Sequence, residues 1–197
     1  MKLFKRMAQT GLVCAFLASC ATIPATSIYK LRNFDIATTD VSRLRIAVQI
    51  PQSIRITPAG VKMTIAARLQ DGSLNEGETL VLSEVDAHGA SGEQRPQPAK
   101  WTQVAAYRLK PADIERISAF RDRIADLKQR HGDQVEGSIS IGVDSCARTL
   151  IPDGPLHITT WIKSEETAEY VVLNRNLDLR REAEKAGQAL EIKPCQN

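Results

Sequence analysis

The sequence has no long hydrophobic run. Its longest apolar stretch extends from Gly11 to Ala18, and charged or turn-forming residues interrupt every later one within a few positions. A helix needs about 20 apolar residues to cross a bilayer. We therefore expect no membrane-spanning helix in this chain.

Histidine is scarce as well: the sequence contains only His88, His131 and His157. Hydrolysis by a nucleophile needs an activated serine or cysteine near a base, which is usually histidine. None of the three histidines lies in a recognisable catalytic motif. The sequence also has no G-x-S-x-G, H-E-x-x-H, P-loop or G-x-G-x-x-G motif. We expect a protein that is not an enzyme and that uses no cofactor.

Cysteine is limited to Cys14, Cys20, Cys146 and Cys195. The sequence has no C-x-x-C pair, and its histidines are far apart, so it lacks the closely spaced ligands of a typical metal site. We expect no bound metal ion.

The N-terminal segment is built like a secretory signal peptide. Basic Lys2, Lys5 and Arg6 precede the apolar run, and small residues follow it. Leu17-Ala18-Ser19-Cys20 resembles the lipobox of bacterial lipoproteins. This resemblance implies cleavage before Cys20 and attachment of a diacylglyceryl group, and usually of an amide-linked fatty acid such as palmitate, to that cysteine.

The lipobox resemblance also implies a location. Two or three acyl chains hold a protein stably at a membrane. In enterobacteria-like systems, Ala21 rather than aspartate after the lipidated cysteine points to the outer membrane, with the domain facing the periplasm. Two other interpretations stay open: an ordinary signal peptide cut at an Ala-x-Ala-like site, and a buried N-terminal helix of a cytosolic protein.

Removal of residues 1–19 changes the charge balance. The sequence has 26 basic and 23 acidic residues, and Lys2, Lys5 and Arg6 lie in the segment that is removed. The remaining 23 basic residues equal the acidic ones, so the mature chain has no net charge. A nucleic-acid partner is therefore not expected.

Processing also leaves two cysteines, Cys146 and Cys195, for the mature domain. In an oxidising periplasm such a pair normally forms a disulfide, and only one pairing is possible. Free thiols are the alternative.

Hydropathy patterns predict one domain over residues 41–197, preceded by a lipid-attached tether and entry segment at residues 20–40. Alternation of apolar and polar residues predicts strands, and Pro111 followed by an apolar stripe predicts a long amphipathic helix over residues 111–130. The expected fold class is α+β: a mainly antiparallel sheet of about seven strands, the long helix, and a short C-terminal helix near residues 178–186. The predicted strands cover residues 44–50, 61–69, 79–85, 101–109, 138–143, 156–162 and 170–173.

One strand offers a candidate binding face. Alternation places His157, Thr159 and Trp161 on the same side, and we expect Tyr170 on one neighbouring strand and Ser138 and Ser140 on the other. Such a polar platform with aromatic anchors suits a glycan, a peptide or a lipid headgroup. The alternative is an aromatic pair that only stabilises the sheet.

These observations predict a lipoprotein anchored in the cell envelope through Cys20, with a non-catalytic role in binding or assembly and an unknown envelope protein as partner. An alternative is an accessory lipoprotein of an envelope transport system, although no motif singles out that family. A periplasmic hydrolase is a third hypothesis.

Overall fold

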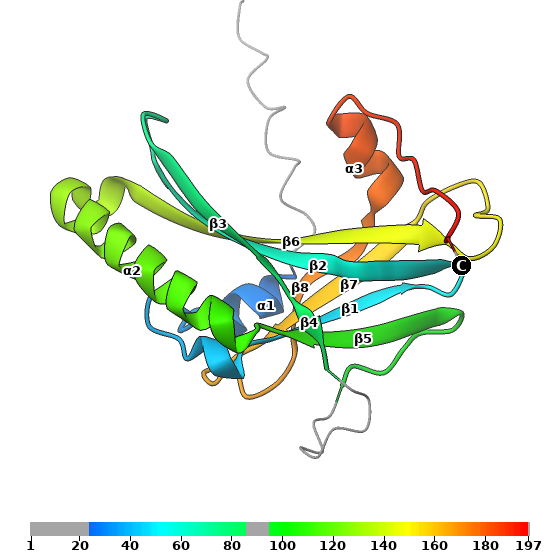
Figure 1. Ribbon diagram of the computed structural model, residues 1–197, viewed down its shortest axis with the longest axis horizontal. Coiled ribbons are helices and arrows are strands. Elements are labelled where there is room, and N and C mark those ends of the chain that lie inside the picture. The colour runs from blue at the N-terminus through cyan, green and yellow to red at the C-terminus, as the bar shows by residue number, and fades with distance from the viewer. Residues whose placement is uncertain (1–23, 86–94, 197) are drawn as a thin grey trace, which may run out of the picture.

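The computed structural model describes residues 24–85 and 95–196 (Figure 1). The lipobox with Cys20, the first residues of the expected tether and His88 lie outside the described residues.

The described residues contain three α-helices and eight strands, which follow one another along the chain in the order given next. They are α1 (Ala25–Lys30), β1 (Arg45–Pro51), β2 (Ile54–Leu69), β3 (Asn75–Val81), β4 (Ser83–Glu84), β5 (Thr102–Arg108), α2 (Pro111–His131), β6 (Val135–Ala147), β7 (His157–Lys163), β8 (Val171–Asp178) and α3 (Leu179–Lys185). Short 3-10 turns, Val41–Arg43 and Gly132–Gln134, precede β1 and β6.

The strands form two antiparallel sheets. One has five strands in the order β4-β5-β1-β7-β8, and the other has three in the order β3-β2-β6. The α+β class, the long helix and the short C-terminal helix are as the sequence predicted. The division into two sheets was not foreseen, because alternation shows which side of a strand is buried but not which strand lies beside it.

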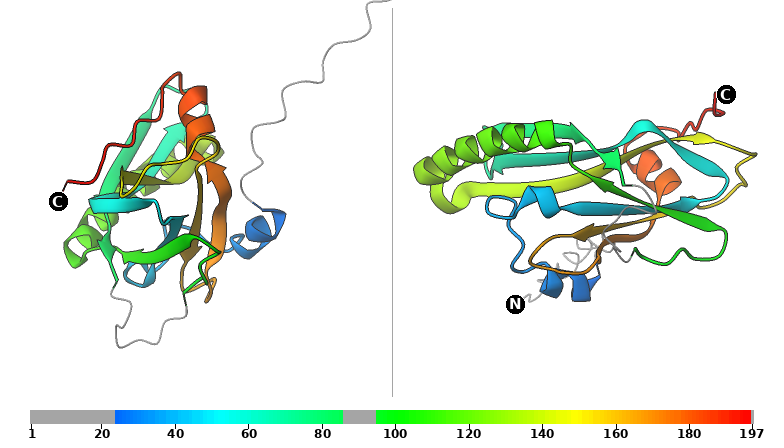
Figure 2. Two further views of the ribbon diagram at one scale, coloured as in Figure 1. Left: turned by 90° about the vertical axis from the view of Figure 1, so that its right-hand side faces the viewer. Right: turned by 60° about the horizontal axis from the view of Figure 1, so that its bottom comes forward.

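The core lies between the two sheets and under α2. Val48 of β1 and Ile162 of β7 contribute to it from the five-stranded sheet, and Met63 and Ile65 of β2 from the other, each of them almost completely buried. Figure 2 shows α2 running along the three-stranded sheet, while β1, β5 and β7 lie on the opposite side of the core.

Helix α2 begins and ends where the sequence predicts. Pro111 occupies the first turn, and Gly132, with a φ of 56°, ends the helix in a backbone conformation that favours glycine. The apolar stripe is buried as expected at Ile117, Phe120, Ile124 and Leu127. The structure therefore supports the interpretation of this stripe as a packing surface within the domain.

Strand β2 is longer than expected and irregular near its start. Its pairing with β6 shifts register between Ile56 and Val61, and Ala59 within this bulge has a φ of 59°. Gly60 lies so close to β6 that a Cβ atom there would come within 2.6 Å of the Asp144 carbonyl oxygen. The bulge bends β2 away from a regular ladder and shapes the cleft described below.

Candidate functional site

The disulfide predicted from the sequence is present. The Sγ atoms of Cys146 and Cys195 are 2.04 Å apart, and the Cα atoms are 4.9 Å apart. Backbone bonds support the bridge: Ala147 donates to the Lys193 carbonyl, and Cys195 donates to the Ala147 carbonyl. The C-terminal segment is thereby fixed to the end of β6.

The candidate platform residues do not form one compact group. His157 is exposed at the first position of β7, opposite Asp178 of β8. Trp161 lies four residues further along β7 and is half-buried. At about 3.3 Å per residue, the two positions are about 13 Å apart along the strand.

Trp161 and Tyr170 do share one end of the β7–β8 hairpin. Trp161 pairs with Val172, and Tyr170 comes directly before β8. The Lys163 ammonium lies 5.8 Å from the centre of the Tyr170 ring, a distance that permits a cation–π contact. This end of the hairpin thus carries two aromatic residues and a cation beside one of them, and His157 is not part of it.

The expected position of Ser138 and Ser140 beside this face was wrong. Both belong to β6, where they pair with Ala66 and Thr64 of the three-stranded sheet. The neighbours of β7 are instead β1 and β8. The error arose because strands that follow each other along the chain were assumed to pair, whereas β7 crosses to the other sheet.

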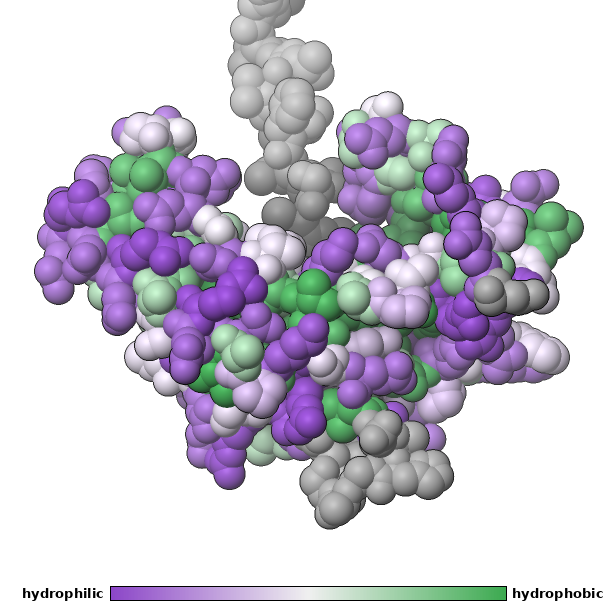
Figure 3. Space-filling model, viewed as in Figure 1, coloured by the Kyte–Doolittle hydropathy of each residue, from purple (hydrophilic) through white to green (hydrophobic). Residues whose placement is uncertain are grey.

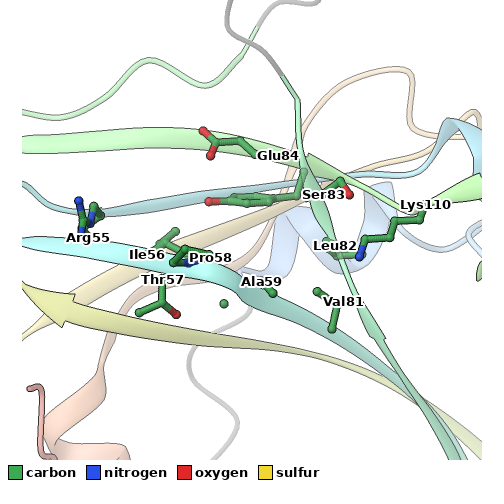
Figure 4. A pocket seen from close by; sticks show the side chains of 12 residues that line it. Arg55, Ile56, Thr57, Pro58, Ala59, Val81, Leu82, Ser83, Glu84 and Lys110 are labelled. Atoms are coloured by element: carbon green, nitrogen blue, oxygen red, sulfur yellow. The ribbon is translucent and has the colours of Figure 1, made fainter. Parts of the chain in front are cut away.

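A cleft of about 560 Å³ opens between the bulge of β2 and strand β4 (Figure 4). Figure 4 shows Arg55 near one end of the cleft and Lys110 near the other, with Glu84 between them along its upper side. A second hollow of about 270 Å³ shares Arg55, Glu84 and Tyr107 with the first and adds Arg148. The two hollows therefore share part of their lining, which carries charges of both signs.

Tyr107 contributes a buried phenol to this cleft. Only 5% of the residue is exposed. Burial raises the pKa of the Tyr107 phenol above its usual value, and the negative charge of Glu84 adds to this effect. The hydroxyl group is consequently protonated at neutral pH and available as a hydrogen-bond donor.

The cleft is lined by charged side chains and hydroxyls. The residues described as lining it include Arg55, Glu84 and Lys110, and the hydroxyls of Thr57 and Ser83. These groups can form hydrogen bonds with a polar ligand.

A second surface feature, which the sequence analysis did not identify, is an apolar groove at one end of the molecule. Trp101 and Leu150 both line it, together with Pro51, Ile151 and Pro155. Trp101 is 71% exposed and Leu150 is 93% exposed. We call this surface the Trp101–Leu150 end.

The Trp101–Leu150 end is well fixed by the backbone around it. Gln52 donates to the Trp101 carbonyl, and Arg148 donates to the Ser53 carbonyl, so the backbone at Trp101 and the segment that leads to Leu150 are both held to the turn between β1 and β2. In the hydropathy view of Figure 3, apolar residues come to the surface near α3 and around the loop that follows β6, amid a mostly polar face. Tryptophan is enriched at protein interfaces, and so large an exposed apolar pair points to a contact surface.

No helix in residues 24–85 and 95–196 is long and apolar enough to span a membrane. Within the same ranges, no group of three or more histidine, cysteine, aspartate or glutamate side chains is arranged to hold a metal ion.

No family model matches the chain, and comparisons with curated proteins and with solved structures likewise give no match.

Proposed function

We propose that the protein is a bacterial lipoprotein of the cell envelope that holds another protein near the periplasmic surface of the membrane. The observation that carries this proposal is the Trp101–Leu150 end. An exposed tryptophan and an exposed leucine on one fixed groove form the apolar centre of a protein contact, while polar residues around them form its rim.

Two further features support an envelope location. The Leu17–Cys20 segment has the residues of a lipobox after a short apolar run. The Cys146–Cys195 disulfide fits an oxidising compartment, because such bonds form and persist in the periplasm and are rare in the cytosol. Together they favour a domain that is exported and then tethered through Cys20.

Photo-crosslinking in intact cells tests the binding role. A photoreactive amino acid at position 150 should give a discrete crosslinked partner. The same amino acid at Gln129, an exposed position of α2, is the matched control and should give none. The substitution Trp101→Ala should weaken the crosslink from position 150, because the partner loses an aromatic contact.

The identity of the crosslinked partner distinguishes a general binding role from an accessory role in transport. A crosslinked partner that is a subunit of a transporter would give the protein the accessory role in envelope transport. Identical crosslinking from positions 150 and 129, or a crosslink that Trp101→Ala leaves unchanged, would contradict a specific contact at this end.

Anchoring is tested separately with Cys20→Ser. This variant should accumulate as an uncleaved precursor without lipid, because signal peptide removal in lipoproteins depends on the modified cysteine. A Cys20→Ser protein that is processed and membrane-bound like the wild type would overturn the anchoring proposal.

A further inference from the structure

Helix α1 presents an apolar surface that no described part of the domain covers. Ile28 is 64% exposed and Tyr29 is 67% exposed, whereas Ser27 in the same turn is buried. The helix contacts β8. Its buried side therefore faces the domain, and Ile28 and Tyr29 lie on the side that faces away from it.

The position of α1 in the chain limits where this surface can lie. Pro24, the first described residue, follows Cys20 by only four residues. Four residues span at most about 14 Å even when fully extended. If Cys20 carries membrane-inserted acyl chains, Pro24 lies within that distance of the lipidated residue, and α1, which begins at the next residue, lies close to the lipid headgroups.

The side chains of α1, and that of Arg32 just after it, match the chemistry of that region. Tyrosine is enriched at membrane–water interfaces, where its ring meets the acyl boundary and its hydroxyl meets water. The Arg32 guanidinium lies 3.8 Å from the centre of the Tyr29 ring, so a cation that can contact lipid phosphates lies beside the aromatic ring. Lys30 forms a 2.6 Å ion pair with Glu169 and so adds little net charge to this surface.

We propose that Ile28 and Tyr29 of α1, together with Arg32 just after the end of this helix, form a membrane-contact face that rests on the phospholipid headgroups beside the lipidated Cys20. This inference rests on the proposed anchoring. Its consequence is a fixed orientation: the lipid attaches the domain, and α1 prevents it from rotating freely about the tether.

Fluorescence quenching by brominated lipids tests the contact, because bromine quenches tryptophan only at short range. The full-length protein carrying Tyr29→Trp is purified with its lipid and reconstituted in phosphatidylethanolamine–phosphatidylglycerol vesicles. Part of the lipid is brominated near the carbonyl end of the acyl chain. The wild-type protein, with Trp101 and Trp161, gives the background emission.

The matched control is Gln129→Trp, which adds an exposed tryptophan on α2. Figure 2 shows α2 and α1 on opposite sides of the molecule. We expect the emission added by Tyr29→Trp to be lost largely in brominated vesicles, and the emission added by Gln129→Trp to be retained.

Mass spectrometry of the vesicle-bound protein distinguishes two kinds of failure. A protein with lipid on Cys20 whose added Tyr29→Trp emission is not quenched overturns the membrane-contact face and leaves the anchoring intact. An unmodified Cys20 overturns the anchoring itself, and the membrane-contact face with it.

Discussion

The Thr39 hydroxyl donates a 2.9 Å hydrogen bond to Oε1 of Glu166. Thr39 is almost completely buried in the segment before β1, and Glu166 lies in the turn between β7 and β8. Arg121 of α2 donates to the carbonyl of the same Thr39. The chain that leads from α1 into the domain is thus held at one point by the β7–β8 turn and by α2.

Thr39→Val should loosen this junction. The substitution keeps the shape of the side chain and removes the donor to Glu166, whose carboxylate remains accessible to water. We expect a loss of about 1 kcal/mol in the free energy of unfolding, measured by urea titration. Thr38→Val is the matched control, because Thr38 is exposed. Equal stabilities of the two variants would contradict a role for the Thr39–Glu166 bond.

Acid should destabilise the protein, partly through Glu78 of β3. A hydrogen bond from Arg116 lowers the pKa of Glu78, burial opposes this effect, and Arg123 adds to the lowering. Because the pKa of Glu78 is lower in the folded state, its contribution to stability is present above the usual glutamate value of 4.5. That contribution is lost as the pH falls from there through the folded-state pKa.

Unfolding titrations at several pH values check this prediction. When the pH is lowered from 7 to below the usual glutamate pKa, Glu78→Gln should lose less stability than the wild type does. At neutral pH the substitution should lower the free energy of unfolding by under about 1 kcal/mol, because the ion pairs of Glu78 are partly exposed. Glu115→Gln, an exposed carboxylate of α2 with no described partner, should follow the wild type. The idea fails if Glu78→Gln and the wild type lose stability in parallel.

The positions of most elements followed from local sequence, whereas their arrangement in space did not. Apolar alternation located β1, β5 and β7, and Pro111 and Gly132 marked the limits of α2. These signals are local because side-chain periodicity reflects the geometry of each element. Pairing of β6 with β2 depends on contacts between segments distant in the chain, which periodicity does not encode.

Among the candidate sites, too, only some features could be predicted from the sequence. The disulfide was predictable because the expected processing at Cys20 would leave only Cys146 and Cys195 for pairing. The exposure of Trp101 and Leu150 was not predictable, since burial of an apolar residue beside a turn depends on which distant segments pack against it. The predicted strand over residues 61–69 covers only part of β2, because the structure continues this strand back to Ile54 through a bulge.

Gly60→Ala should damage the β2 bulge. A Cβ atom at this position would meet the Asp144 carbonyl and the Thr57 backbone at less than 3.0 Å. Because backbone atoms of two strands must move, we expect a loss of about 1–3 kcal/mol. Ala59→Gly is the counterpart variant. Ala59 has a φ of 59°, a conformation that glycine adopts more readily than alanine, so this variant should change the free energy of unfolding little. A Gly60→Ala protein as stable as the wild type in urea would contradict this account of the bulge.

Loss of the Cys146–Cys195 bridge should lower stability without abolishing the fold. Closing a loop with a sequence separation of 49 contributes up to about 4 kcal/mol in the chain-entropy model. We expect the double variant Cys146→Ser/Cys195→Ser to unfold at lower urea concentration than the wild type. The backbone amide at position 195 should exchange its hydrogen faster in this variant. Gel mobility should change on reduction in the wild type alone. Unchanged mobility of the wild type would show that the bridge does not form in cells.

Trp161 lies at the aromatic end of the β7–β8 hairpin. Trp161 is half-buried and pairs with Ala47 of β1, which is completely buried. If Trp161 only stabilises the sheet, Trp161→Ala should lower the free energy of unfolding by about 2–3 kcal/mol, less than for a fully buried tryptophan.

The matched variant Tyr170→Phe keeps the ring near Lys163 and should change stability by less than Trp161→Ala does. Crosslinking from position 150 distinguishes a structural from a binding role of Trp161. A stability loss with an unchanged crosslink assigns Trp161 to packing, because a destabilised but folded domain still presents the Trp101–Leu150 end. A crosslink that disappears while the protein remains folded would instead place Trp161 in the partner-binding surface and restore the platform hypothesis for this end of the hairpin.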